Sequence, residues 1–290
     1  MPKDFIYGLA VAPEGRCFAA RESGLYRSDD GGNSWHSAYD ALKLNIPVST
    51  TALAISPAFA QDRTLFAAVS GGVLRSTDGA QTWSAIPLPE PPPILSALAF
   101  SPVYSDDGVV LATSFARGAF YSTDRGETWW KDNYALLDPR ILALAISPNF
   151  AQDHRVLIGT ETGVFSSING GRSWEFVDVP YIAVPSVAFA PNGIAYAGTD
   201  GDGMYTSADN GRTWTRSTLE NTLSINLILT PSERDLLVFA DTTLYRSLDA
   251  GATWMMHELP SAVSAAVLLN AARLLVGYSD GTIGGIDLQG

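Results

Sequence analysis

Six copies of one eight-residue segment run through the chain and constrain its fold more than any other feature. The copies are SDDGGNSW (28–35), STDGAQTW (76–83), STDRGETW (122–129), SINGGRSW (167–174), SADNGRTW (207–214) and SLDAGATW (247–254). Their final tryptophans are 48, 46, 45, 40 and 40 residues apart. A repeat of this length indicates an array of one supersecondary unit.

One unit can be delimited in residues 50–88, where four short runs of apolar and β-branched residues are separated by segments that contain Gly, Pro and Asp. No helical period persists in this window. The pattern predicts four antiparallel strands at about 50–56, 63–70, 72–76 and 82–88. Segments equivalent to the first three strands recur seven times, whereas the eight-residue box occurs six times.

Four-stranded units of this length without helices are typical of a β-propeller. We therefore predict an all-β fold, a seven-bladed β-propeller of four-stranded antiparallel blades that forms a single domain over 1–290. The expected blades are 1–40, 41–88, 89–133, 134–180, 181–218, 219–258 and 259–290. The last blade is expected to be incomplete because 261–290 supply three strands, and its exposed edge offers a possible route to a dimer.

The composition narrows the range of partners. The chain has 290 residues with 18 Lys and Arg against 30 Asp and Glu, a net charge of −12. This charge opposes binding to nucleic acid. Cys17 is the only cysteine, so no intramolecular disulfide forms and a reducing compartment is favoured. The short apolar run at the start predicts neither a signal peptide nor a transmembrane segment. We expect a cytoplasmic protein, or a secreted one if a leader has been removed.

The box residues suit a hairpin turn between the third and fourth strands of a blade. An Asp or Asn at the turn accepts backbone N–H groups, and Gly provides a positive φ. The Trp is expected to wedge between neighbouring blades. We therefore assign a structural role to the following residues: Asp30, Trp35, Asp78, Trp83, Asp124, Trp129, Asn169, Trp174, Asp209, Trp214, Asp249 and Trp254.

The pattern S-x-D-x-G-x-[ST]-W, present in six copies, resembles the Asp-box or BNR repeat. Propellers with this repeat include sialidases, xyloglucan hydrolases, sortilin-type receptors and photosystem II assembly factors. The resemblance implies the propeller fold and leaves the activity open, because function depends on sites grafted onto the fold. A single propeller of this length is most similar to the assembly factors.

Further segments are assigned as structure. The stretches SPAFAQDR (56–63), SPVYSDDG (101–108) and SPNFAQDHR (147–155) are expected to be loops between the first and second strands, on the same face as the boxes. Cys17 is expected to pack as a small apolar residue. The histidines, at 36, 154 and 257, lack the spacing of a zinc site.

Catalytic chemistry finds little support in the sequence. A sialidase would carry an Arg-Ile-Pro motif, and the nearest string is Asn45-Ile46-Pro47. We predict no catalytic residue, metal or cofactor, and we favour a protein without enzymatic activity. Asp200 and Asp202 could contact a sugar hydroxyl in a glycine-rich loop. A carbohydrate-binding or glycoside hydrolase-like propeller therefore remains the alternative.

A protein partner is the favoured ligand, on the face opposite the boxes. Its longest segments are 36–50, 84–96 and 130–141, and the EPPP run at 90–93 could form a stiff ledge. Arg117, Trp130, Tyr134 and Arg140 are predicted to cluster near the third and fourth blades. Aromatic and arginine side chains are typical of interface hot spots.

Overall fold

The computed structural model describes residues 4–89, 91–219 and 223–288. Seven antiparallel sheets follow one another along the chain, each with its strands in sequence order. The fold is a seven-bladed β-propeller, as the repeat predicts, and its last blade has three strands. In the described part of the chain, no helix has the length and apolarity needed to cross a membrane.

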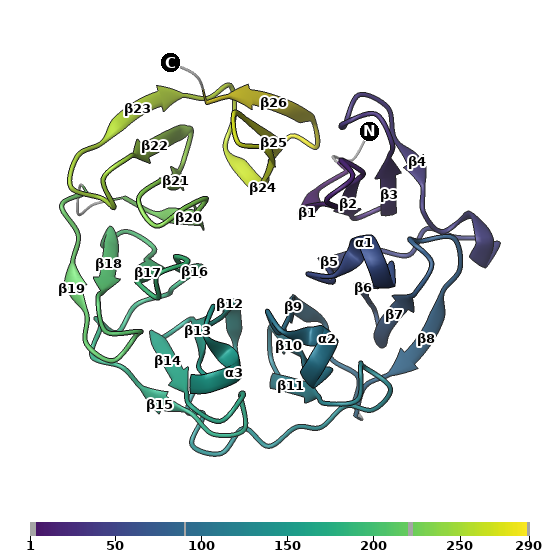
Figure 1. The fold of residues 1–290 in the computed structure, drawn as a ribbon, viewed down its shortest axis with the longest axis horizontal. Coiled ribbons are helices and arrows are strands. Elements are labelled where there is room, and N and C mark those ends of the chain that lie inside the picture. The colour runs from purple at the N-terminus through teal and green to yellow at the C-terminus, as the bar shows by residue number, and fades with distance from the viewer. Residues whose placement is uncertain (1–3, 90, 220–222, 289–290) are drawn as a thin grey trace. The chain divides into compact units, whose positions relative to one another are not determined.

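The strands can be followed in Figure 1. The first sheet contains β1 (Ile6–Val11), β2 (Cys17–Arg21), β3 (Gly24–Ser28) and β4 (His36–Ser37). The second contains β5 (Thr50–Ile55), β6 (Leu65–Val69), β7 (Gly72–Ser76) and β8 (Ser84–Pro87), and the third contains β9 (Leu95–Phe100), β10 (Val110–Ser114) and β11 (Gly118–Ser122). The seventh contains β24 (Val263–Asn270), β25 (Arg273–Tyr278) and β26 (Ile283–Asp287).

The remaining sheets lie between the third and the seventh in sequence. The fourth contains β12 (Ile141–Ile146), β13 (Val156–Thr160), β14 (Val164–Ser167) and β15 (Glu175–Phe176). The fifth contains β16 (Ser186–Phe189), β17 (Ala195–Gly198), β18 (Met204–Ser207) and β19 (Thr215–Arg216). The sixth contains β20 (Ile225–Leu229), β21 (Leu236–Ala240), β22 (Thr243–Ser247) and β23 (Met255–Glu258).

The chain divides into two compact units, the first formed by 1–112, 122–129 and 264–290 and the second by 113–121 and 130–263. In the first unit, a core that includes Phe18, Tyr39 and Phe59 joins the first two sheets. Strand β25 contacts β1 in the same unit, so the last blade packs against the first. In the second unit, β12 contacts β16 and β16 contacts β20.

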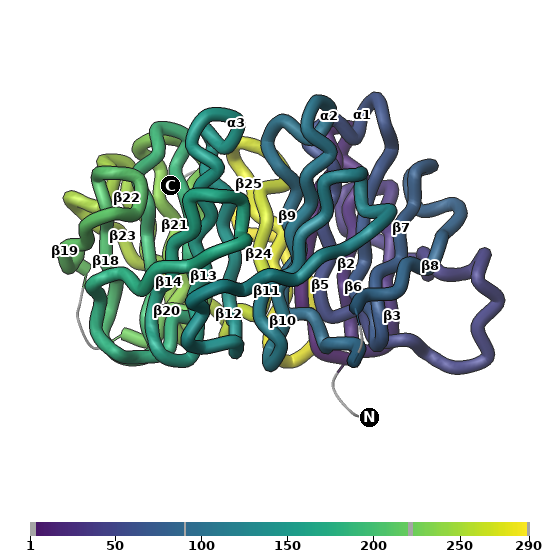
Figure 2. The backbone as a smooth tube through the Cα atoms, turned by 90° about the horizontal axis from the view of Figure 1, so that it is seen from below, coloured from purple at the N-terminus to yellow at the C-terminus, as the bar shows by residue number. Residues whose placement is uncertain are grey.

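Three details differ from the sequence prediction. The segments expected to be loops between first and second strands each contain a one-turn helix: α1 (Phe59–Asp62), α2 (Tyr104–Asp107) and α3 (Phe150–Asp153). Each turn ends in a residue with left-handed backbone, such as Arg63, whose N–H returns to the carbonyl of Phe59. Figure 2 shows α1 and α2 at the same edge of the first unit.

The other two differences concern the fourth strand of a blade. In the second blade, where the sequence predicts the strand at about 82–88, β8 begins at Ser84, directly after the box tryptophan, and β15 likewise begins at Glu175. The third sheet lacks a fourth strand, and Tyr121 and Trp130 form an isolated bridge in its place.

The blade-seven edge and the EPPP ledge remain predictions. Strand β26 pairs with β25, and among the described residues no further strand joins that sheet. Residues 1–3 lie outside the described residues, as does Glu90 of the ledge.

Cys17 is buried, and burial raises the pKa of its thiol to about 11.

Candidate functional site

Each box closes its turn with its own hydrogen bonds. In the first copy, the Asp30 carboxylate accepts the hydroxyls of Ser28 at 2.7 Å and Ser34 at 2.6 Å. It also accepts the backbone N–H groups of Asn33 at 3.1 Å and Ser34 at 2.9 Å. The other copies repeat this pattern around Asp78, Asp124, Asp209 and Asp249.

The fourth copy keeps the turn with an amide. Asn169 Oδ1 accepts the Ser167 hydroxyl and the N–H groups of Arg172 and Ser173, and its Nδ2 donates to Ser173 Oγ at 2.8 Å. An amide can replace the carboxylate in this turn because its single oxygen accepts the backbone N–H groups. The Ser173 hydroxyl, whose equivalent donates to a carboxylate in the other boxes, here accepts from the amide Nδ2.

The donors hold the box carboxylates in the ionised form. The hydroxyl and backbone N–H of Ser34 lower the pKa of Asp30 well below its usual range. Burial opposes the shift at Asp78, yet the hydroxyl and N–H of Thr82 lower its pKa to about 2. Carboxylates stabilised in this way are poor proton donors near neutral pH.

A second contact ties the boxes to the one-turn helices. Gly79 N–H donates to the Arg63 carbonyl at 3.0 Å, and Gly170 N–H donates to the His154 carbonyl at 2.9 Å. The two kinds of turn therefore lie on one face within each blade.

At Gly126, φ is +80°, and a Cβ would lie 2.4 Å from Phe66 Cζ of the preceding blade. Only glycine fits that approach.

The box tryptophans pack between blades within each unit. Trp129 packs edge-on against Phe66, and Trp83 packs edge-on against Tyr39 with ring centroids 5.4 Å apart. Trp83 Nε1 also donates to the carbonyl of Ala38 at 2.8 Å. Further indole N–H groups bind within their own turn, as Trp35 and Trp214 do, or a neighbouring hydroxyl, as Trp254 does.

The four residues predicted to cluster in the second unit make separate contacts. Arg140 forms ion pairs with Asp138 at 2.9 Å and with Glu161. The N–H of Gly118 donates to the carbonyl of Pro139. Because Arg117 precedes Gly118 and Arg140 follows Pro139, the backbones of the two arginines lie near each other.

The two aromatic members make other contacts. Trp130 is 58% exposed and pairs through its backbone with Tyr121. Tyr134 is 76% exposed, and its backbone bonds to Arg172 and Trp174 at the fourth box. Backbone contacts therefore bring the segments of the two arginines together, and a different set of contacts joins Tyr134 to the fourth box. A joint binding role for the four residues stays a prediction.

The glycine-rich loop is also held internally. Asp202 accepts the Tyr205 hydroxyl at 2.6 Å and forms an ion pair with Arg216. Asp200 is exposed and pairs through its backbone with Ser224. In the described ranges, no group of three His, Cys, Asp or Glu side chains is arranged to hold a metal ion.

A pocket of about 350 Å³ lies beside β3 in the first unit. Strand β4 pairs with β3 only through Tyr26 with Ser37 and Arg27 with His36, a length that it shares with β15 and β19, and the pocket forms between β3 and the segment that follows β4. In the second blade, β8 instead follows β7 from Arg75 back to Gly72. After β4, a 3₁₀ turn at Asp40–Leu42 carries the chain away from the sheet.

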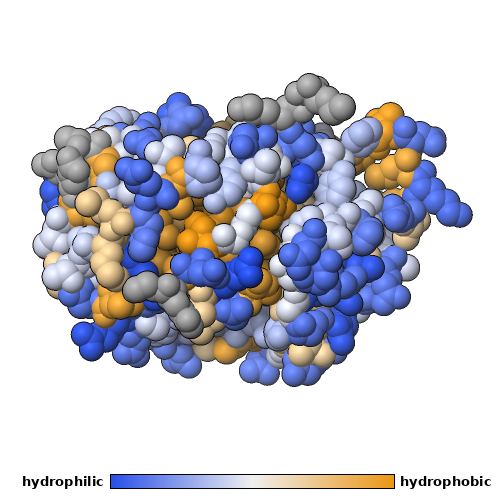
Figure 3. Space-filling view, turned by 90° about the horizontal axis from the view of Figure 1, so that it is seen from above, coloured by the Kyte–Doolittle hydropathy of each residue, from blue (hydrophilic) through white to orange (hydrophobic). Residues whose placement is uncertain are grey.

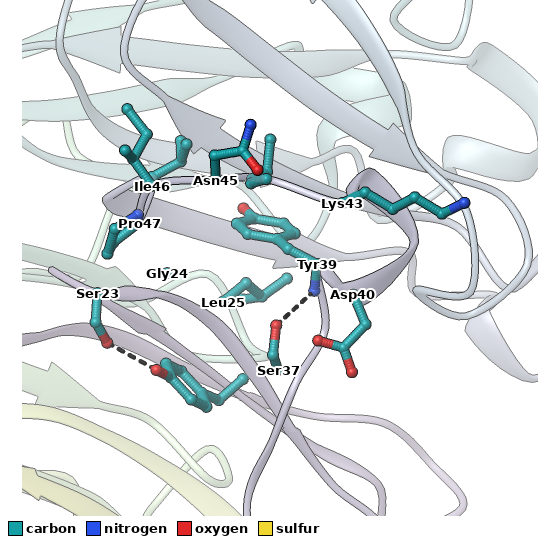
Figure 4. A pocket seen from close by; sticks show the side chains of 13 residues that line it. Ser23, Gly24, Leu25, Ser37, Tyr39, Asp40, Lys43, Asn45, Ile46 and Pro47 are labelled. Atoms are coloured by element: carbon teal, nitrogen blue, oxygen red, sulfur yellow. Dashed lines mark hydrogen bonds between the residues drawn. The ribbon is translucent and has the colours of Figure 1, made fainter.

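The base of the pocket is rigid. Leu25 and Tyr39 are both buried, and the Tyr39 hydroxyl lies 2.8 Å from Thr50 Oγ1. Burial raises the pKa of Tyr39, so its hydroxyl stays protonated. Figure 4 shows the Tyr39 ring between Leu25 and Asn45, with Lys43 extending away from it. Because Trp83 binds the Ala38 carbonyl, the second box supports the pocket base.

The outer wall is apolar and exposed. Ile46 is 72% exposed, and Leu44 is also exposed, both on the segment that follows the 3₁₀ turn. Figure 3 shows hydrophobic atoms gathered on this projecting segment at the upper right. Ser23 and Asn45 add polar groups at the rim, where the Ser23 hydroxyl donates to the Asp4 carboxylate at 2.8 Å and lies 3.0 Å from the Tyr26 hydroxyl.

The sequence prediction included residues 36–50 in the partner face but did not single out a pocket there. A signal was present: after the first box tryptophan, HSAYDALKL lacks the alternation that SAIPL shows after the second. Such a break predicts a short fourth strand. The side chains that would then line the gap could not be assigned without the backbone.

The geometry defines a propeller with structural boxes and an irregular first-blade edge, and known proteins share this fold. The chain matches the Sortilin, neurotensin receptor 3 family (Sortilin-Vps10) over residues 23–136. No curated protein sequence matches it. Together with the structures below, this match confirms the resemblance to Asp-box propellers.

Three solved structures illustrate the similarity. YCF48 bound to a D1 peptide is 16% identical, with a TM-score of 0.75 over 98% of this chain and 92% of that one. YCF48 from Cyanidioschyzon merolae is 14% identical, with a TM-score of 0.71 over 98% and 95%. The GH74 xyloglucanase from Xanthomonas campestris is 20% identical, with a TM-score of 0.77 over 99% of this chain and 52% of that one. At these identities the similarity shows the fold alone.

Proposed function

We propose that this chain is a non-enzymatic propeller that binds a short extended segment of a protein partner at the pocket beside β3. The observation that carries the proposal is the segment after β4, which leaves the sheet at the 3₁₀ turn and encloses an apolar base at Leu25 and Tyr39 under an exposed apolar wall. Buried apolar bases with polar rims are typical of binding pockets.

The pocket suits one apolar side chain of an extended peptide. That side chain would contact Leu25 and Tyr39, while Leu44 and Ile46 would cover its flank. Polar groups of Ser23 and Asn45 lie at the rim, where they could bind the peptide backbone. Because the base is held by Thr50 and Trp83, binding would require little reorganisation, which favours affinity.

The fold comparison supports the choice of ligand. A structure of the same fold and nearly the same length, YCF48, is described with a bound peptide from D1. From this structure we infer the kind of ligand, a segment of a protein. On that basis we propose an assembly-factor-like or scaffold role for this chain. A cytoplasmic location and a dimer through the β26 edge belong to the same proposal.

A carbohydrate ligand is the second candidate, favoured by the fold similarity to a xyloglucanase. Hydrolysis of a glycoside generally needs two carboxylates that flank the bond. Among the described residues around the β3 pocket, Asp40 is the single carboxylate. This pocket therefore supports sugar binding better than sugar cleavage.

A random twelve-residue peptide library displayed on phage tests the proposal. We expect enriched peptides to share an apolar position and to bind the purified protein. Ile46→Asp should weaken that binding by about tenfold or more, because a charge would enter the apolar wall. Met256→Asp, at a position 71% exposed in β23 of the second unit, is the matched control and should leave binding unchanged.

A xyloglucan oligosaccharide forms the second arm of the experiment. Equal binding of the enriched peptides to both variants would contradict the proposed pocket. Failure to enrich any peptide, combined with xyloglucan binding that Ile46→Asp abolishes, would establish the carbohydrate alternative instead.

A further inference from the structure

A second cavity, of about 970 Å³, lies in the second unit, between the fourth and fifth blades. Its lining comes from the end of α3, from the segment 173–178 and from the fifth box. The lining includes a buried arginine, which is unusual because a charged side chain is rarely buried without a partner.

Arg155 is 6% exposed, and its Nη1 donates to Ser166 Oγ at 2.8 Å. Its Nε has no hydrogen-bond partner, and the described part of the chain gives it no ion pair. Burial and the nearby charge of Arg212 lower the pKa of Arg155. An anion next to the guanidinium would counter both effects.

Trp174 adds a second donor to the same cavity. It is 4% exposed, and its Nε1 has no partner among the described residues. Arg212 is exposed at the cavity wall. Arg155, Arg212 and Trp174 therefore line one cavity, and guanidinium and indole groups are donors without acceptor capacity.

The acidic residues nearby limit the charge of the ligand. The Asp153 carboxylate already accepts three hydrogen bonds: from Ser147 Oγ at 2.7 Å, from Asn210 Nδ2 at 2.6 Å and from the backbone N–H of Arg155 at 2.9 Å. Glu175 and Asp178 also line the cavity. Their charges oppose a divalent phosphate more than a singly charged ligand.

We propose that this cavity binds a single carboxylate group, held by Arg155 and Arg212 with Trp174 as a further donor. A carboxylate presents two oxygens in a plane, which matches the planar fork of a guanidinium. This site is separate from the pocket beside β3 and does not depend on the peptide proposed for it.

Acetate, inorganic phosphate and a blocked dipeptide with a free C-terminus, each titrated at constant ionic strength, test the proposal. The readout is the indole N–H signal of Trp174 in a ¹H–¹⁵N spectrum, assigned with Trp174→Phe. We expect acetate or the dipeptide to shift this signal, and phosphate to bind more weakly. Binding by the dipeptide but not by its C-terminal amide would identify a chain end as the source of the carboxylate.

Arg212→Gln should weaken carboxylate binding about tenfold, the loss expected for one charge-assisted hydrogen bond. Arg216→Gln is the matched control, because Arg216 is an arginine of the same blade that already pairs with Asp202. Arg155→Gln should abolish binding. If the Arg155 variant fails to fold, Arg212→Gln still tests the proposal, because Arg212 is exposed. Absence of a shift, tighter binding of phosphate, or equal loss in Arg216→Gln would overturn the proposal.

Discussion

The boxes and the two cavities use similar residues with opposite results. In the box at 28–35, Asp30 accepts hydrogen bonds from two hydroxyls and two backbone N–H groups, all from its own turn. In the cavity of the second unit, the Arg155 Nε and the Trp174 Nε1 have no partner among the described residues. The acidic groups of the repeated turns are satisfied within each box, whereas the buried indole N–H groups of two box tryptophans, Trp129 and Trp174, have no partner among the described residues. The comparison teaches that the repeated turn marks the scaffold, and that donors left unpaired beside it mark a candidate site.

The largest expected effect distinguishes two adjacent tryptophans. Trp129→Ala removes a buried ring that packs against Phe66 and should destabilise the fold by about 3–5 kcal/mol. Trp130→Ala, beside it but 58% exposed, should cost about 1 kcal/mol or less. Urea unfolding followed by far-ultraviolet circular dichroism measures both. Similar losses in the two variants would contradict the scaffold role of the box ring.

A smaller effect is expected from the box carboxylate. Asp78→Ala removes the acceptor of the Ser76 hydroxyl and of the Gln81 and Thr82 donors, and should cost about 1–3 kcal/mol. Asp78→Asn should cost less, because the fourth box already forms its turn with Asn169. The same urea titration ranks the two variants. An Asn variant as unstable as the Ala variant would show that the turn requires the charge.

Acid should weaken the boxes through protonation of these carboxylates. The pKa of Asp78 is lowered from 3.8 to about 2, so the unfolded chain binds more protons than the folded chain between these values. The stabilisation is complete above pH 4 and is lost as the pH falls toward 2. Unfolding free energies measured across this range should fall more steeply for the native protein than for Asp78→Asn. Parallel curves would contradict the assignment of the shift to Asp78.

The fold could be predicted because its signals are local and repeated. The strand at 72–76 coincides with β7, since an alternating run between a Gly pair and a box leaves few alternatives. The one-turn helices were missed because four residues, such as those from Phe59 to Asp62, are too few to show a helical period.

The candidate sites were harder to predict because they depend on contacts between distant segments. The β3 pocket needs Leu25 and Tyr39 to meet beneath the segment that carries Ile46. Arg155 carried a usable signal: it follows the SPNFAQDH segment where the second blade has the buried Thr64. A long cation at a position that is buried in another copy predicts either an ion pair or a ligand, and the backbone is needed to decide between them.

The most direct test of this account measures stability and peptide binding on the same two variants, Ile46→Asp and Asp249→Asn, the second in a box that, among the described residues, does not contact the pocket lining. A peptide enriched from the phage library serves as the probe, and binding is measured by fluorescence anisotropy at a temperature where both variants are folded. We predict that Ile46→Asp loses binding by about tenfold or more and changes stability by about 0.5 kcal/mol or less. Asp249→Asn should lose stability and keep its affinity. Loss of affinity in Asp249→Asn, with full affinity in Ile46→Asp, would contradict the separation of scaffold and site.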